Sequence, residues 1–195
     1  MSRSAGTNAP HRAGVVHVDI KKPGNIPDGG GHKVLGRATG RRHRTDTGYS
    51  YIHNALDDHS RLAYSEILPD ERKETAVAFW ARAQAYFTSV GITVARVLTD
   101  NGACYRSHAW RDALAEAGIV HKRTRPYRPQ TNGKVERFNR TLLDEWAYAR
   151  TYTSEAERRA TFNEWIHTYN HHRGHTALKG LPPASRVPNL TRQNT

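Results

Sequence analysis

Two short apolar runs in this sequence each lead to an aspartate, and this pattern limits the fold more than any other feature. Residues 15–20 carry Asp19 near their end, and Asp100 directly follows the apolar run 94–99. Short runs of this kind, rich in valine and isoleucine, predict strands. Folding can therefore bring the two carboxylates face to face at the ends of neighbouring strands.

A third acid, Glu136, lies in the first turn of a helix expected to begin after Gly133. Three carboxylates within ~4 Å would repel by roughly 4 kcal/mol per pair at an effective dielectric near 20, so they take up protons or share cations. Hard cations such as Mg²⁺ or Mn²⁺ prefer oxygen ligands, and two ions ~3.5 to 4 Å apart support in-line displacement at phosphorus. Asp19, Asp100 and Glu136 are candidate catalytic and metal-binding residues, although by itself a lone aspartate on a strand, such as Asp19, is more often a hairpin or salt-bridge residue.

These residues resemble the DDE triad of retroviral-type integrases and related insertion-sequence transposases, with thirty-five residues between Asp100 and Glu136. The surrounding motifs resemble that family in order and spacing. They are LTDNG at 98–102, PYRPQTNGKVE at 126–136, YNHHRGH at 169–175, Leu178, and the pair Pro182 and Pro183. The resemblance covers residues 15–187 and implies metal-dependent DNA 3′-end cleavage and strand transfer with two Mg²⁺ or Mn²⁺ ions. It also implies element ends and target DNA as partners, and a homo-oligomer assembled on DNA.

Periodicity predicts an α/β domain, and the resemblance implies a ribonuclease-H-like fold with a mixed five-stranded sheet flanked by helices. Strands are expected at 15–20, 49–56, 61–68, 94–99 and 119–122. Helices are expected at 75–90, 107–117 and 154–171. A further helix is expected from 133 onward, with apolar side chains along one face as far as Ala149. The predicted divisions are a disordered lead (1–14), the catalytic core (15–173) with a long basic loop at 21–47, and an extended tail (174–195).

The net charge of +12 predicts attraction to a polyanion such as DNA. Basic and amide residues near the acids, and in the two expected loops, are candidate phosphate contacts, although a solvated basic surface is the alternative interpretation. The candidates are Arg41, Arg42, Arg44, Arg123, Arg125, Arg128, Lys134, Arg137, Asn139 and Arg140.

Several other features are expected to be structural. The single cysteine, Cys104, excludes an internal disulfide and is predicted to be a small buried thiol. Asp57 and Asp58 are expected to stabilise a turn, and a zinc site at His171, His172 and His175 is disfavoured because no fourth ligand is evident. Without an apolar stretch of about 18 residues, the protein is expected to be soluble and cytoplasmic, and the resemblance implies association with a bacterial nucleoid.

One departure from the family leaves two alternative functions open. Related transposases usually carry a helix-turn-helix region before the catalytic core, whereas only about fourteen polar residues precede it here. A truncated, inactive form is therefore an alternative, in which the chain is an idle DNA-binding remnant. The other alternative is a ribonuclease-H-like nuclease or resolvase that cuts nucleic acid without joining ends.

Overall fold

The structure is a computed structural model, and it describes residues 14–31, 34, 36, 47–124 and 132–191. Its five strands are β1 (Gly14–Lys21), β2 (Tyr51–Asp57), β3 (Ala63–Leu68), β4 (Val94–Thr99) and β5 (Val120–Arg123). Its main helices are α2 (Lys73–Ser89), α3 (His108–Glu116), α4 (Gly133–Leu142), α5 (Glu155–Ala160), α6 (Phe162–His171) and α7 (Pro188–Thr191). The predicted strands and the helices α2 and α3 are confirmed to within a few residues.

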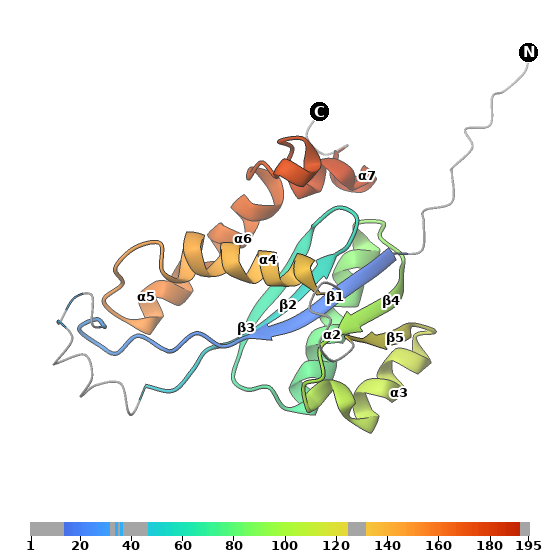
Figure 1. The fold of residues 1–195 in the computed structure, drawn as a ribbon, viewed down its shortest axis with the longest axis horizontal. Coiled ribbons are helices and arrows are strands. Elements are labelled where there is room, and N and C mark those ends of the chain that lie inside the picture. The colour runs from blue at the N-terminus through green and yellow to red at the C-terminus, as the bar shows by residue number, and fades with distance from the viewer. Residues whose placement is uncertain (1–13, 32–33, 35, 37–46, 125–131, 192–195) are drawn as a thin grey trace, which may run out of the picture.

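The strands form one mixed sheet in the order β3-β2-β1-β4-β5 (Figure 1). β1 is antiparallel to β2 and parallel to β4, while β4 and β5 are also parallel. β2 and β3 form the antiparallel hairpin expected from the sequence. The predicted five-stranded α/β architecture is therefore confirmed, with β1 at the centre of the sheet.

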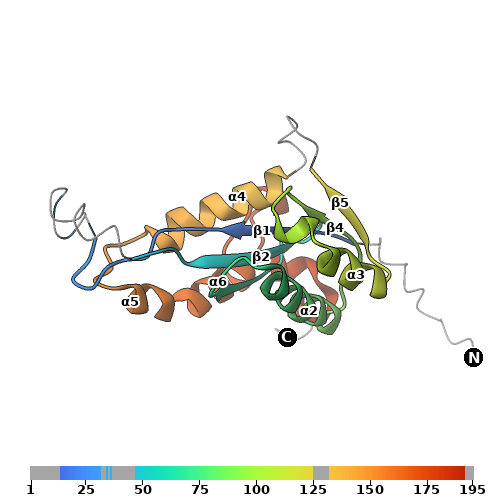
Figure 2. The ribbon, with the colours of Figure 1, turned by 90° about the horizontal axis from the view of Figure 1, so that it is seen from below.

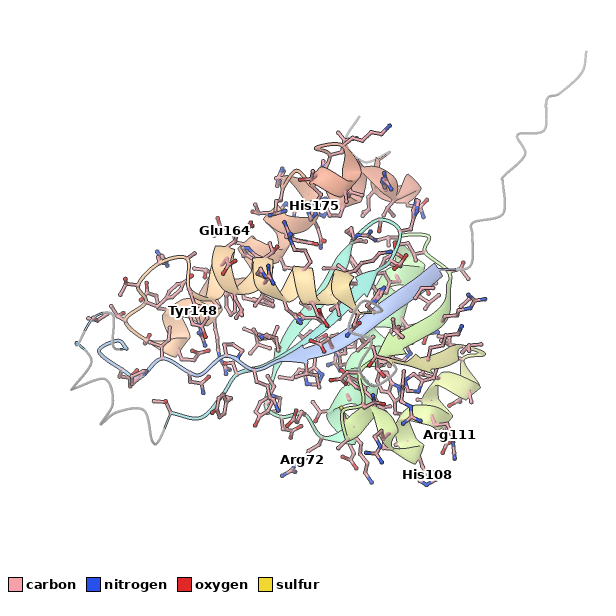
Figure 3. The ribbon with its side chains drawn as sticks, viewed as in Figure 1. Arg72, His108, Arg111, Tyr148, Glu164 and His175 are labelled. Atoms are coloured by element: carbon pink, nitrogen blue, oxygen red, sulfur yellow. The ribbon has the colours of Figure 1, made fainter. Side chains whose placement is uncertain are left out.

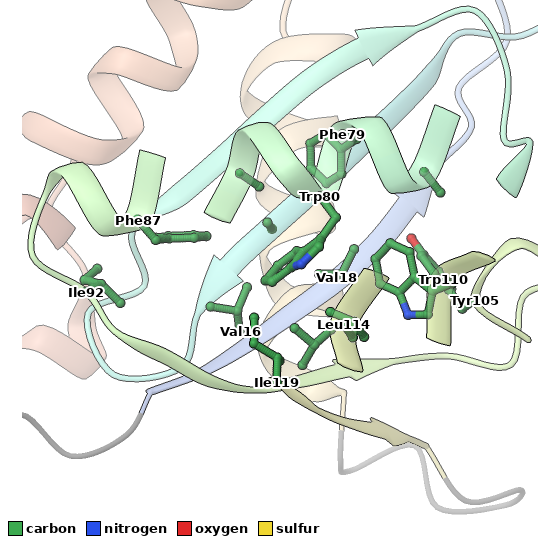
Figure 4. Packing of buried hydrophobic residues seen from close by; sticks show 14 of the residues in the cluster. Val16, Val18, Phe79, Trp80, Phe87, Ile92, Tyr105, Trp110, Leu114 and Ile119 are labelled. Carbon is green, nitrogen blue, oxygen red and sulfur yellow. The ribbon is translucent and has the colours of Figure 1, made fainter. Parts of the chain in front are cut away.

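Helices cover both faces of the sheet (Figure 2). On one face, α2 and α3 enclose a core that includes Val16, Val18, Trp80 and Trp110 (Figure 4). On the other face, α4 packs over β1 and β2, and its Phe138 ring lies 4.9 Å from the Tyr169 ring of α6. Within the described residues, no helix is both long and apolar enough to cross a membrane.

The apolar packing face predicted for the helix that begins at Gly133 is correct as far as Trp146 but wrong at Ala149. A five-residue π-helical turn, Leu143–Ala147, follows α4, and it buries Trp146 and Ala147 while Ala149 is exposed. The helix ends with this turn at Ala147, and residues 148–150 form a turn and bends. Ala149 therefore lies beyond the helix and cannot be part of its packing face.

The helix expected at 154–171 is interrupted at Thr161, which separates α5 from α6. Its predicted start is confirmed, because the Glu157 amide donates to Ser154 Oγ at 3.1 Å. The Thr161 hydroxyl donates to the Arg158 carbonyl at 2.9 Å, which supplies a local alternative to continued helical hydrogen bonding.

The described part of the tail, 174–191, is not the extended segment that the sequence predicted. It forms 3-10 turns at Thr176–Leu178 and Pro183–Arg186 and then α7, and Val187 is buried in the core beside α2. The fixed φ of proline suits the first residues of a helical turn, which explains the turn that begins at Pro183. Cys104 is buried as predicted, and burial raises the pKa of its thiol to about 11.

Candidate active site

Asp19 lies near the carboxyl end of β1, beside the position where β4 ends. In the parallel pairing of β1 with β4, Val18 lies opposite Thr99. Asp19 is the residue after Val18 and Asp100 is the residue after Thr99, so the two acids occupy corresponding positions. Side chains alternate along a strand, and Val18 faces the α2 side of the sheet while Asp19 faces α4. The topology thus brings two of the three predicted acids to neighbouring strand ends.

The Asp19 carboxyl group is electrostatically coupled to both other predicted acids. Burial raises the pKa of Asp19, and the nearby Asp100 and Glu136 carboxylates raise it further. A hydrogen bond from Asn139 and the charge of Lys21 oppose this rise. Asp100 and Glu136 are therefore close enough to Asp19 to act on its charge.

Two asparagines hold Asp19 from the side of α4. Asn139 Nδ2 donates to Asp19 Oδ2 at 2.6 Å, and Asn54 Nδ2 donates to Asn139 Oδ1 at 2.9 Å. Asn54 lies directly opposite Asp19 in the β1–β2 pairing and is fully buried. Asn54 was not among the predicted site residues, because nothing in the predicted strand, which also carries Ser50 and His53, distinguishes its amide. Asn139 was predicted to contact DNA, whereas this side chain is only 7% exposed and lies between Asp19 and Asn54.

The loop after β4 holds Asp100 in a tight turn. Gly102 donates its backbone N–H to Asp100 Oδ1 at 2.8 Å, and Asn101 Nδ2 donates to the Thr124 carbonyl at 3.0 Å, just after β5. A Cβ atom at Gly102 would lie 3.0 Å from Asp100 Oδ1, so a glycine at this position leaves room for the carboxylate. The LTDNG motif therefore supplies both an acid and the backbone that orients it.

Glu136 occupies the first turn of α4, as predicted, and its side chain is exposed. Like Asp19 and Asp100, it carries a carboxylate, the ligand type that suits Mg²⁺ or Mn²⁺. In the part of the chain that the structure describes, no three His, Cys, Asp or Glu side chains are close enough together to hold a metal ion. The metal-binding role of the three acids therefore stays a prediction.

The nine predicted DNA contacts other than Asn139 divide into three groups. Arg41, Arg42, Arg44, Arg125 and Arg128 lie outside the described residues. Arg123 at the end of β5, and Arg137 and Arg140 on α4, are exposed near the carboxylates. Lys134 is different, because its ammonium group is paired with Asp58 at 2.5 Å.

The two turn aspartates have separate roles. Asp57 Oδ2 accepts hydrogen bonds from the Ser60 N–H and hydroxyl, both at 2.7 Å, which confirms the predicted turn. Asp58 Oδ1 instead accepts from His17 Nε2 at 2.7 Å and from Lys134. Burial alone would raise the pKa of Asp58, but these two hydrogen bonds lower it below its usual value.

Comparison with family models gives two matches that together cover most of the chain. A model described as an integrase core domain matches residues 9–129, and a second model with the same description matches residues 117–183. The first of these matches alone covers more than half of the sequence.

Curated relatives include a putative integrase, ORF3, of Spiroplasma virus SpV1-C74, which is 24% identical over 154 residues. That alignment covers 72% of this chain and 42% of the relative. A 39.2 kDa protein of insertion element IS476 from Xanthomonas euvesicatoria is 33% identical over 97 residues, covering 50% of this chain and 28% of the relative. The chain thus spans less than half the length of either relative.

Solved structures with a similar fold include the catalytic core domain of HTLV-2 integrase in complex with magnesium, with a TM-score of 0.61 at 13% identity. That comparison covers 89% of this chain and 95% of the other. The BIV integrase catalytic core has a TM-score of 0.56 at 19% identity, covering 92% and 97%. These similarities confirm the predicted ribonuclease-H-like fold.

Proposed function

The chain belongs to the integrase core domain family, and from this premise we propose that it is the catalytic core of a metal-dependent polynucleotidyl transferase. Asp19, Asp100 and Glu136 are the proposed catalytic residues. The substrates are the DNA ends of a mobile element and a target DNA. Water first cleaves a phosphodiester bond and leaves a free 3′-hydroxyl, which then attacks a phosphodiester of the target and releases a new 3′-hydroxyl.

The observation that supports this proposal best is the position of Asp19 and Asp100 at the neighbouring ends of β1 and β4. Burial and two neighbouring carboxylates make the anionic form of the Asp19 side chain costly, and Asn139 nevertheless holds it in place. Ionisable groups whose charged form is destabilised by their surroundings are common at functional sites. A hard divalent cation is the natural counter-charge for such a cluster.

The three acids would hold one or two Mg²⁺ or Mn²⁺ ions. When bound, such ions lower the pKa of an attacking hydroxyl and stabilise the leaving oxygen. Asn139 fixes one oxygen of Asp19, and the turn at Gly102 fixes one oxygen of Asp100. The exposed guanidinium groups of Arg123, Arg137 and Arg140 are proposed to bind phosphates beside these acids. Homo-oligomers assembled on DNA are also part of the proposal.

Strand transfer between labelled oligonucleotides, with Mg²⁺ or Mn²⁺, tests this function. Asp100→Asn should lower the rate by about 10³-fold, equivalent to about 4 kcal/mol of transition-state stabilisation. Asp112→Asn is the matched control, because Asp112 pairs with Arg111 on the exposed side of α3, away from α4 (Figure 3). Equal rates for wild type and Asp100→Asn would refute the assignment.

The same assay separates the two alternative functions. Cut products without joined products would indicate a ribonuclease-H-like nuclease. Salt-dependent DNA binding with neither cutting nor joining would indicate an idle remnant.

A further inference from the structure

A small charged network connects β1, the β2–β3 turn and the start of α4. Asp58 Oδ1 accepts hydrogen bonds from His17 Nε2 at 2.7 Å and from Lys134 Nζ at 2.5 Å. His17 Nδ1 lies 3.3 Å from Asn132 Oδ1. His17 is 3% exposed and Asn132 is 5% exposed. The Asp58 and Lys134 side chains are 34% and 39% exposed, so two buried and two partly exposed polar side chains from three segments meet in this contact.

The network lies beside the candidate active site along both the strand and the helix. His17 precedes Asp19 by two residues on β1, so both side chains face α4. Lys134 precedes Glu136 by two residues in the first turn of α4. The contact thus fixes the distance between the backbone that carries Asp19 and the backbone that carries Glu136.

Two residues of this network depart from the usual preferences at a helix start. Asn132 occupies the N-cap position, yet its side chain makes no capping hydrogen bond. Lys134 places a positive charge near the helix N-terminus, where the helix dipole disfavours it. Departures of this kind gather where a tertiary contact or a function outweighs local preference. Here both side chains are directed to β1 and the β2–β3 turn.

A second contact holds α4 on the other side of Glu136. Asn139, three residues after Glu136, donates to Asp19 on the same strand. The exposed Glu136 side chain is therefore carried by a helical turn that is held to β1 on both sides. Because that side chain is exposed, its position depends on where this turn lies.

We propose that His17, Asp58 and Lys134 are positioning residues that hold Glu136 within reach of Asp19 and Asp100. This inference rests on the proposed function, since it concerns the geometry of the same site. It also changes the expectation for Lys134, which acts through Asp58 instead of binding a DNA phosphate. Residues that orient a metal ligand typically affect activity by about 10- to 100-fold.

Asp58→Asn and Lys134→Met distinguish the two roles of Lys134. If the network positions Glu136, both variants lower kcat by about 10- to 100-fold and leave the salt dependence of DNA binding unchanged. Their double variant should be no worse than the poorer single variant, because the two changes break one contact. Lys73→Met is the matched control, since Lys73 is an exposed lysine on α2 at the opposite face of the sheet.

A phosphate contact predicts a different set of results. Lys134→Met would then weaken DNA binding and reduce the salt slope by about one, while Asp58→Asn would bind DNA more tightly because a negative charge is removed. That pair of results would overturn the positioning role. Lys134→Arg keeps the charge and should restore most of kcat if the pairing with Asp58 is what matters.

Amide hydrogen exchange supplies a readout that does not depend on activity. The Glu136 N–H is bonded to the Asn132 carbonyl at 3.1 Å, and it should exchange faster in Asp58→Asn and Lys134→Met than in wild type. Faster exchange confined to the first turn of α4 supports the inference, even if wild type proves inactive and the proposed function fails. Unchanged exchange there, or equally faster exchange throughout the sheet, would overturn it.

Discussion

Val16 and Val18 of β1 face helices α2 and α3, whereas His17 and Asp19 on the same strand face α4. The valine side is filled by aromatic and aliphatic groups, including Trp80 and Trp110 with ring centroids 6.2 Å apart (Figure 4). The α4 side combines an apolar cluster with buried polar groups. One strand therefore contributes to two environments with different physical requirements.

The difference shows how the molecule separates stability from chemistry. Burial of apolar area on the valine side stabilises the fold and needs no particular charge. On the α4 side, Asp19 is held near two other carboxylates, and its raised pKa shows that its ionised form is disfavoured there. A site of this kind lowers stability in return for function. Substitutions on the two sides should therefore have opposite consequences.

The largest expected effect is a loss of stability on the valine side. Phe79→Ala removes a fully buried ring and should lower the free energy of unfolding by about 3–5 kcal/mol. Urea unfolding measures this change, and Leu181→Ala, at a side chain that is 54% exposed, is the control expected within about 0.5 kcal/mol of wild type. The Mn²⁺ affinity of the folded Phe79→Ala protein should stay near that of wild type. A matching loss of metal affinity would show that the two sides are not separable.

An intermediate effect is expected at Asn139 on the other side. Asn139→Ala removes the hydrogen bond that lowers the pKa of Asp19, so this pKa rises further. Activity that needs ionised Asp19 should then be lost at a higher pH during acidification, with a rate at neutral pH about 10- to 100-fold lower. The pH–rate profile measures both changes. Asn163→Ala, at an exposed asparagine of α6, is the control. If the acidic limb of the pH–rate profile does not shift in Asn139→Ala, then Asn139 does not control the ionisation of Asp19.

The sequence predicts local elements well because their signals are local. The helix expected at 107–117 begins after Ser107, whose hydroxyl accepts from the Trp110 N–H at 3.2 Å. The apolar run before Asp100 becomes β4 with the predicted bounds. The arrangement of the strands and the choice of Asp19 depended on the family resemblance, because a lone aspartate on a strand is not distinctive.

The features that were missed depend on contacts between distant residues. Asp58 carries the same turn signal as Asp57, and its partner Lys134 lies 76 residues away, so spacing could not distinguish their roles. The π-helical turn after Leu142 has no clear sequence signature, and the helix ends with it at Ala147, before Ala149. Local patterns together with the family resemblance therefore located the acids, whereas the polar contacts that hold them became visible only in the structure.

The smallest expected effect on stability is at Asp19 itself, and the sign of this effect is the sharpest test of the comparison. The folded-state pKa of Asp19 lies above the usual value of 3.8, so the folded protein binds this proton more tightly than the unfolded chain. The contribution of Asp19 to the free energy of unfolding therefore falls as pH rises through that pKa. At pH 7 the ionised carboxylate destabilises the folded protein. Asp19→Asn should raise the thermal midpoint at pH 7 while abolishing strand transfer.

The amide oxygen of the Asp19→Asn variant can still accept the hydrogen bond from Asn139, so the substitution removes the charge and keeps the contact. Its stabilising effect should shrink as pH falls below the usual value of 3.8, where the wild-type carboxyl group is protonated in both states. Thermal unfolding at pH 7 and near pH 3, without divalent ions and with Asp112→Asn as control, measures this dependence. A lower midpoint for Asp19→Asn at pH 7 would mean that the carboxylate stabilises the fold, and the separation of stability from chemistry across β1 would then be wrong.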